Sequence, residues 1–432
     1  MAKAPVVGFA GLTHLGICSG AAAAERGFEV VGFHPIKEEL GAIKNGELPV
    51  SEPGLEDLLN RNLHRITYTA NPNDLEACDI VYIAVDVPTN NEGVSDLKLI
   101  DDIISLVQRS IDENTILVIL CQVPPGFTRQ INRPPSLLFY QVETLIFGKA
   151  VERAQKPERF IVGCADPISQ LPQHLCTFLS AFDCPILPMR YESAELAKIS
   201  INMCLVASIG VANTLAEICE NNGADWSEII PSLRLDKRIG KHSYIEPGLG
   251  IAGGNLERDM ATVLNLAAKH NTDASVVSAL VSNSDHTKSW AYRMFEKYAL
   301  LDNSTPAISV LGLAYKENTN STKNSPSLAL LNKLVNYDVT VFDPIVRISD
   351  LPYNFKEFFS ALEAIDGADI LFIMTPWPTF RELKIDDIKN RMRGKMIIDP
   401  FGVLKPEIAT TAGIDYITRG APAQLSFSIE QS

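Results

Sequence analysis

Short apolar runs recur along the first part of the chain, and each has the length of a single strand. They open at Val6 and then cover 29–33, 79–85 and 115–120. Continuous apolar runs of this kind are typical of parallel strands that are buried on both faces. Helix-like segments separate the runs, so the order of elements predicts an α/β fold with a doubly wound parallel sheet.

A second series of strand-like runs follows in the last third of the chain. Its members cover 306–311, 339–343, 369–375 and 396–399. Between the two series, residues 191–202 have apolar positions at helical spacing, and the spacing continues to Ile218 before Asn221-Asn222-Gly223 ends it. We therefore expect one long helix that links two domains and can pair with its copy in a dimer.

Composition limits the partners of the chain. It has 432 residues, of which 46% are hydrophobic and 21% charged, as in ordinary soluble enzymes. The formal net charge of −14 argues against nucleic acid, because phosphate binding needs a concentrated basic face. We find no apolar run of about 18 residues and no basic apolar leader, so we expect no membrane span and no signal peptide. The eight cysteines form no C-x-x-C pair, which predicts reduced cytoplasmic thiols and no zinc or other metal site.

The first strand leads into GFAGLTHLG, and a helix rich in small residues follows it. A glycine-rich turn between a strand and a helix lets a pyrophosphate approach the backbone at the start of the helix. The fit to G-x-G-x-x-G is partial, since Gly8 matches but Ala10 and Thr13 replace the second and third glycines. We still predict a dinucleotide site, formed by Gly8, Ala10, Gly11, Leu12 and Thr13.

The second strand ends at an unusual residue for such a site. A carboxylate that binds the ribose of NAD is expected there, but the chain has His34. Lys37 lies nearby and could accept the 2′-phosphate of NADP. No arginine follows it, so NAD is favoured over NADP as the cofactor.

The segment 247–259, PGLGIAGGNLERD, is rich in glycine and makes a poor helix interior. Such a segment is often a flexible surface loop. An apolar, helix-like run follows at once, so Asn255 or Asp259 is expected near a helix N-terminus, where backbone N–H groups can hold an anion. The pattern alone leaves both a plain loop and a binding loop open.

The same segment resembles the active-site loop G-x-G-F-G-G-S-C-F-P-K-D of the UDP-glucose/GDP-mannose dehydrogenases, with matches at Gly250, Gly253 and Asp259. Further motifs of that family occur in order between Gly8 and about Leu404. They are E-P-G-L at 52–55, V-P-P-G at 123–126, P-E-R at 157–159, E-L-x-K-x-x-x-N at 195–202, D-x-R-I-G at 236–240, G-L-A-Y-K at 312–316 and T-x-W-x-x-F-R-x-L at 375–383. The chain is therefore identified as a divergent member of this family.

The resemblance implies two Rossmann-like doubly wound parallel-sheet domains joined by a long central helix. The expected domains are 1–190 for the dinucleotide, 191–300 as a central helical domain that carries the loop 247–259, and 301–432 for a nucleotide sugar. The resemblance further implies an NAD-dependent oxidoreductase of polysaccharide biosynthesis in the cytoplasm, acting on a UDP- or GDP-sugar. A homodimer through the central helix is expected, with neither nucleic acid nor membrane as a partner.

The resemblance also assigns roles to individual residues. The catalytic group is expected to comprise Lys198, Asp259, Asn202, Glu158, Asn255 and Gln122. The cofactor is expected to contact the glycine turn and His34, Lys37, Val85, Pro88, Thr89, Gln122 and Lys323. The substrate is expected to contact Glu158, Arg159, Phe160, Lys198, Asn202, Arg238, Tyr244, Gly250, Tyr315 and Lys316.

Two departures from the family bear on the reaction. Asn255 stands at the position of the nucleophilic cysteine, and Gln122 stands at that of a threonine that helps to hold a catalytic water. Family enzymes remove two hydrides in turn, and the second leaves from a covalent thiohemiacetal, which an asparagine amide cannot form. We therefore expect a single two-electron oxidation. A four-electron 6-dehydrogenase that uses another thiol or a water, and a catalytically inactive nucleotide-binding homologue, stay open as alternatives.

Overall fold

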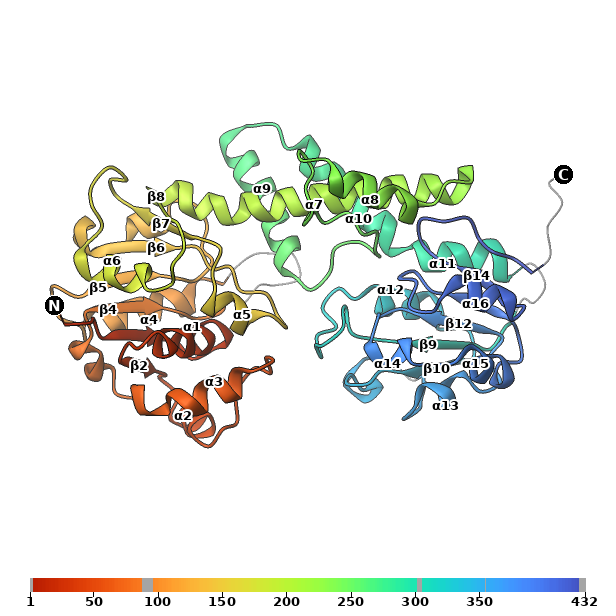
Figure 1. Cartoon of the computed structure of the whole chain (residues 1–432), viewed down its shortest axis with the longest axis horizontal. Helices are drawn as coiled ribbons and strands as arrows, with labels where there is room; N and C mark the ends of the chain where they lie inside the picture. The colour runs from red at the N-terminus through yellow and green to blue at the C-terminus, as the bar shows by residue number, and fades with distance from the viewer. Residues whose placement is uncertain (1–2, 88–95, 301–304, 354, 427–432) are drawn as a thin grey trace. The chain divides into compact units, whose positions relative to one another are not determined.

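The computed structural model describes residues 3–87, 96–300, 305–353 and 355–426 (Figure 1). The chain divides into two compact units, residues 1–201 and 202–432. Each unit has its own sheet of mainly parallel strands and its own hydrophobic core. The fold class predicted from the alternation of apolar runs and helices is confirmed.

The sheet of the first unit has the strand order β3-β2-β1-β4-β5-β6-β7-β8. Among the strands that the structure describes, only β6 and β7 pair antiparallel. The strands are β1 (Val7–Ala10), β2 (Val30–Phe33), β3 (Ile66–Thr69), β4 (Ile80–Ile83), β5 (Ile116–Ile119), β6 (Leu138–Gln141), β7 (Phe160–Cys164) and β8 (Ile186–Arg190). The first six strands have the order of a dinucleotide-binding fold, whose ligand site lies where the order reverses, between β1 and β4.

Helices cover both faces of this sheet (Figure 1). They are α1 (His14–Glu25), α2 (Lys37–Lys44), α3 (Leu55–Asn62), α4 (Lys98–Gln108), α5 (Ala150–Gln155) and α6 (Gln173–Ser180). The core on one face is aromatic, with Phe9 stacked on Tyr82 at 5.2 Å and Phe178 against Tyr82 at 5.7 Å. α1 packs closely because its inward side carries glycines and alanines, which leave room for the backbone to approach the sheet.

The sheet of the second unit repeats the same topology with six parallel strands, in the order β11-β10-β9-β12-β13-β14. The strands are β9 (Ile308–Leu311), β10 (Val339–Phe342), β11 (Lys356–Glu357), β12 (Ile370–Ile373), β13 (Met396–Ile398) and β14 (Asp415–Ile417). All three tryptophans of the sequence are buried in this unit, at Trp226, Trp290 and Trp377.

The helices of the second unit are more varied in length. They are α8 (Trp226–Leu235), α9 (Asn255–His270), α10 (Ser275–Lys288), α11 (Trp290–Met294), α12 (Pro326–Lys333), α13 (Ala361–Ile365), α14 (Pro378–Arg381), α15 (Ile385–Arg391) and α16 (Pro406–Thr411). The helical stretch from Ser275 to Ala299 is interrupted, because α10 ends at Lys288 and a π-helical turn (Phe295–Ala299) follows α11. Trp290 and Phe295 are both fully buried, and a spacing of five residues does not suit one face of a regular α-helix.

α7 (Tyr191–Asn222) is the long helix predicted from the apolar spacing, and the division between the units falls inside it. Its first turn buries Tyr191 and Ala194 in the core of the first unit, and its last turns bury Ala212 and Ala216 in the second. By length and composition alone α7 could also cross a membrane. Within the most apolar 18-residue stretch of α7, 39% is buried inside the structure.

Candidate active site

The glycine turn at the end of β1 is too tight for other side chains. Gly11 has a φ of +106°, and a Cβ there would lie 2.3 Å from Val85 Cγ1. A Cβ at Gly16 would lie 1.8 Å from the carbonyl oxygen of Gly11. These two glycines, which are out of register with G-x-G-x-x-G, therefore allow the close backbone approach that the motif provides elsewhere.

Thr13 lies between the carboxyl ends of β1 and β4. Its hydroxyl donates to the Ala84 carbonyl at 3.3 Å and accepts from the Asp86 N–H at 3.1 Å. It precedes α1, but its side chain is used in these contacts rather than in capping the helix. The N–H groups of the first turn of α1 therefore face the point where the strand order reverses, and the geometry fits the pyrophosphate of NAD.

A buried carboxylate holds the start of α1. Glu52, from the E-P-G-L segment, accepts from the N–H groups of Gly148 (2.9 Å) and Ala150 (3.1 Å) and lies 3.0 Å from His14 Nε2. The His14 ring stacks on Phe147, with the ring centroids 4.3 Å apart. Glu52 thus ties the dinucleotide turn to the start of α5.

The end of β2 lies beside the same turn, since the Gly11 N–H donates to the Phe33 carbonyl at 2.9 Å. His34 follows and is buried, and its Nε2 lies 2.7 Å from Glu39 Oε2. Lys37 is exposed at the first position of α2. The predicted cofactor residues Pro88 and Thr89 lie outside the described residues.

Lys198 on α7 has a carboxylate partner that the sequence did not suggest. Its Nζ lies 3.6 Å from Glu143 Oε2, and the two side chains are only 15% and 19% exposed. Glu143 comes two residues after β6, near the carboxyl edge of the sheet. Gln122 lies just beyond β5 at the same edge and is half-buried. The first unit therefore brings the Glu143 carboxylate next to Lys198 and carries the Gln122 amide at the same edge of its sheet.

Glu158, another member of the predicted catalytic group, lies in a different environment. Its side chain is 63% exposed and pairs with Arg159 at 2.8 Å and Arg153 at 3.4 Å. Arg153 first, and Arg159 second, hold the pKa of the Glu158 carboxyl below its usual range. A general base works best with a pKa near the operating pH, which is the opposite shift. The neighbouring Phe160 is buried in β7, inside the core.

The glycine loop 247–259 belongs to the second unit and ends in a helix, as predicted. Asn255 is the first residue of α9 and is exposed. The Gly254 N–H donates to Glu257 Oε2 at 3.0 Å, and Lys288 Nζ on α10 donates to Glu257 Oε1 at 3.0 Å. Glu257 therefore closes the loop from its own first helical turn and fixes the position of Asn255.

Two predicted catalytic residues meet behind this loop. Asn202 Nδ2 donates to Asp259 Oδ2 at 2.5 Å, and Arg258 Nε lies 3.4 Å from Asp259 Oδ1. Asp259 is only 1% exposed. A carboxylate this deeply buried next to an arginine and an amide serves to hold α9 and the loop on α7.

The G-L-A-Y-K segment and its neighbours pack on the other side of the loop. The Gly253 N–H donates to the Lys323 carbonyl at 3.0 Å, and a Cβ at Gly253 would lie 2.5 Å from the Tyr315 ring. Lys316 Nζ lies 5.7 Å from the centre of that ring. The structure thus brings Tyr315, Lys316 and Lys323 to the loop. Arg238 instead pairs with Asp236 at the surface, at 2.6 Å.

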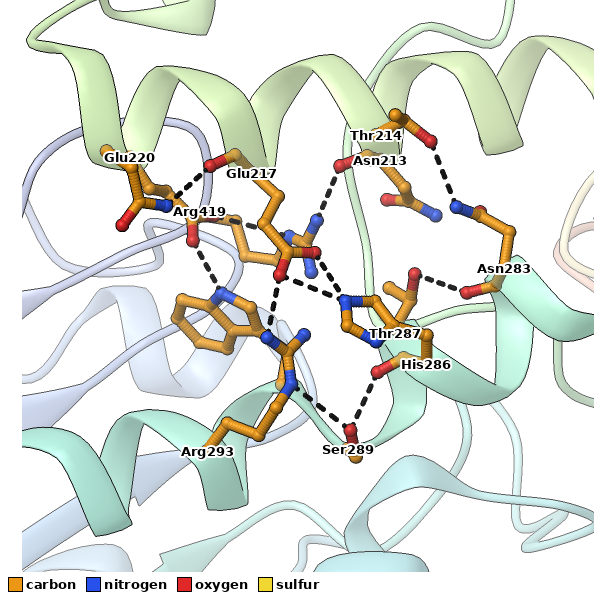
Figure 2. Close-up of polar contacts among 12 residues, drawn as sticks. Asn213, Thr214, Glu217, Glu220, Asn283, His286, Thr287, Ser289, Arg293 and Arg419 are labelled. Carbon is orange, nitrogen blue, oxygen red and sulfur yellow. Dashed lines mark hydrogen bonds and ion pairs between the residues drawn. The ribbon is translucent and has the colours of Figure 1, made fainter.

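A polar cluster under the start of the loop was not predicted (Figure 2). Glu217 on α7 accepts from Arg293 (2.6 Å) and lies 3.0 Å from His286 Nε2. Arg419 is buried and donates to the Asn213 carbonyl at 2.9 Å, while Asn213 Oδ1 accepts from the Gly248 N–H at 2.8 Å. Burial lowers the pKa of Arg419. The contacts of Glu217 and Asn213 connect α7 to α10, α11 and the loop.

Comparison with known proteins gives the same family along most of the chain. Residues 6–175 match the NAD binding domain of the UDP-glucose/GDP-mannose dehydrogenase family, residues 192–285 its central domain, and residues 309–406 its UDP binding domain.

Similar relatives cover nearly the whole chain. It is 28% identical to the UDP-glucose 6-dehydrogenase TuaD of Bacillus subtilis over 96% of this chain and 92% of that protein. It is 29% identical to a UDP-glucose 6-dehydrogenase of Rickettsia typhi, over 96% of this chain and 99% of that protein. The solved structure of a UDP-glucose dehydrogenase from the archaeon Pyrobaculum islandicum matches with a TM-score of 0.84 and 25% identity, over 96% of this chain and 98% of that chain.

Proposed function

Since the chain belongs to the UDP-glucose/GDP-mannose dehydrogenase family, a family of NAD-dependent nucleotide-sugar dehydrogenases, we propose that it oxidises a UDP- or GDP-sugar by one hydride transfer to NAD. The observation that carries this proposal is Asn255, which begins α9 at the place of the family's cysteine. The product is an aldehyde or a ketone of the nucleotide sugar, not a carboxylate.

The first oxidation needs a base and a positive charge beside the oxygen that loses its proton. Lys198 supplies the charge, and we assign the base to its partner Glu143 in place of Glu158, because Glu143 is shielded from solvent and Glu158 is not. NAD, when bound at the glycine turn, supplies the hydride acceptor. Asp259 and Asn202 position the loop that carries Asn255.

A second oxidation needs an adduct on the aldehyde carbon, and the residue at the position of the family's cysteine cannot form one. The Asn255 amide is not a nucleophile under these conditions. Cys121 adjoins Gln122, but it is fully buried, and burial raises the pKa of its thiol to about 12, so it is not a thiolate at neutral pH. Loss of a covalent route typically costs several powers of ten in rate, on the order of 4–8 kcal/mol.

The test counts reduced cofactor per sugar. The purified chain is incubated with limiting UDP- or GDP-sugars and excess NAD, NADH is measured by absorbance, and the product is identified by mass spectrometry. We expect one NADH per sugar and an accumulating aldehyde or ketone. Two NADH and a carboxylate, formed at an ordinary turnover rate, would assign the chain to the four-electron class. No NADH with any sugar, together with binding of the nucleotide, would make it an inactive homologue.

The outer side of α7 supports a homodimer. Val211, Leu215 and Ile218 are 58%, 40% and 50% exposed and follow each other at helical spacing on one side of the helix. An apolar stripe of this kind is expected to pair with its copy. Leu215→Arg should convert the dimer to a monomer in light scattering, whereas Val335→Arg, an exposed valine elsewhere in the unit, should not. A monomeric wild-type chain would contradict the assignment.

The free thiols also support a reducing, cytoplasmic location.

A further inference from the structure

The chain has no carboxylate at the end of β2, where the ribose of NAD is ordinarily bound. We infer that Glu39, in the first turn of α2, binds the adenosine ribose, and that His34 is the positioning residue that holds it there. The inference rests on the proposed function, in which NAD is the oxidant. It concerns two side chains that the sequence pattern did not connect.

His34 occupies the place where the ribose carboxylate ordinarily stands. It follows β2 directly, and the preceding Phe33 carbonyl accepts from the N–H of Gly11 in the dinucleotide turn. Its own N–H donates to the Thr69 carbonyl at 3.1 Å, which fixes its backbone at the sheet edge. A histidine at this point cannot provide the paired acceptor oxygens that a ribose diol uses.

The His34 ring is committed to Glu39. Its Nε2 lies 2.7 Å from Glu39 Oε2, and an ionised carboxylate only accepts, so Nε2–H is the donor. The residue is 8% exposed, and its Nδ1 is buried with no hydrogen-bond partner in the part of the chain that the structure describes. Nε2 is therefore the ring nitrogen that contacts Glu39.

Glu39 has the properties of a ligand group. Its side chain is 60% exposed, and its Oε2 lies 2.7 Å from His34 Nε2, so the carboxylate is held by His34 and still accessible from solvent. It lies in the first turn of α2, two residues after Lys37. A carboxylate accepts from the 2′- and 3′-hydroxyls of NAD and repels the 2′-phosphate of NADP. The pair therefore selects NAD, although the residue at the end of β2 is not an acid.

The test measures binding of NAD and NADP to the full chain by calorimetry, with no sugar present. Glu39→Gln keeps the size of the side chain and removes its charge, and we expect it to weaken NAD binding by about tenfold or more and to reduce the preference for NAD over NADP. Glu38→Gln makes the same charge change one residue away and should alter either affinity by less than about twofold. His34→Gln should weaken NAD binding in the native background but add little in the Glu39→Gln background.

Three results would overturn the inference. One is equal NAD affinity in Glu39→Gln and in the wild type. Another is the same loss in Glu38→Gln as in Glu39→Gln, which would reduce the effect to general charge. The third is a wild-type preference for NADP. If the wild type bound neither cofactor, the proposed function would fall together with the inference, whereas the first two results leave the proposed function intact.

Discussion

Gly253 sits where the active-site loop touches Tyr315, and replacing it with alanine is a sharp test of the loop geometry. Its φ is +89°, and an added Cβ would lie 2.5 Å from Tyr315 Cε2 and 2.6 Å from Cζ. Tyr315 is half-buried, so part of its ring is already packed against other residues. The substitution therefore forces either the loop or the ring to move.

The magnitude follows from these two contributions. The left-handed backbone costs a residue with a Cβ about 1–2 kcal/mol, and forcing a methyl group into filled space costs about 1–3 kcal/mol. A loss of about 2–5 kcal/mol should lower the unfolding midpoint of the second unit by roughly 5–15 °C. Gly248→Ala is a matched control in the same loop, since its Cβ would meet nothing closer than Phe401 at 3.9 Å. It should change stability by less than about 1 kcal/mol.

Scanning calorimetry of the three proteins gives the midpoints, and NADH formation with a nucleotide sugar gives the activity. We expect Gly253→Ala to unfold earlier and to lose activity below its melting point, because the loop that carries Asn255 is displaced. Equal midpoints for Gly253→Ala and Gly248→Ala would refute the loop conformation described here.

The remaining predictions concern the proposed base Glu143, the asparagine at position 255 and the ion pair between Arg393 and Asp369. Glu143→Gln should lower the rate of NADH formation by about 10²–10⁴-fold, and Glu158→Gln should leave this rate nearly unchanged. A kinetic assay in which Glu158→Gln loses the activity and Glu143→Gln keeps it would identify Glu158 as the base. Asn255→Cys should raise the yield above one NADH per sugar and form some carboxylate, which mass spectrometry detects. If no carboxylate formed, the oxidised carbon of the sugar would not lie beside residue 255. Arg393 lowers the pKa of Asp369, so the pair stabilises the fold above the ordinary carboxyl pKa of about 4 and loses that effect as the pH falls through the lowered value. Arg393→Met should therefore lower the melting midpoint at pH 7. It should have no effect at a pH below both the ordinary and the lowered pKa of Asp369. An equal effect at the two pH values would exclude the ion pair as its cause.

Eight of the strands and the long helix could be predicted because their signals are local, whereas β3, β6, β7, β8, β11 and β14 were not predicted. The runs 80–85 and 116–120 are apolar throughout, and β4 and β5 are buried at every position. α7 follows the apolar spacing from Tyr191 to Asn222. The start of α9 at Asn255 was also predictable, since small residues give way there to a helical pattern.

The partners of polar side chains were not predictable in the same way. Glu143 lies in a short irregular stretch after β6, and only the fold shows that it meets Lys198 on α7. Its one sequence signal is its position just beyond a buried strand. Glu158 was chosen from a matching triplet, and the triplet did not show that Arg153 in the preceding helix also pairs with it.

The positions of the tryptophans allow the unfolding of the two units to be followed separately. Trp226, Trp290 and Trp377 are all buried in residues 202–432, and residues 1–201 contain tyrosine but no tryptophan. Emission excited selectively at tryptophan therefore reports denaturation of the nucleotide-sugar half alone, while far-ultraviolet circular dichroism reports both halves. Transitions that coincide in the two signals would mean that α7 couples the halves into one cooperative block. Transitions that separate would give the stability of the NAD-binding half by difference, without cutting the chain.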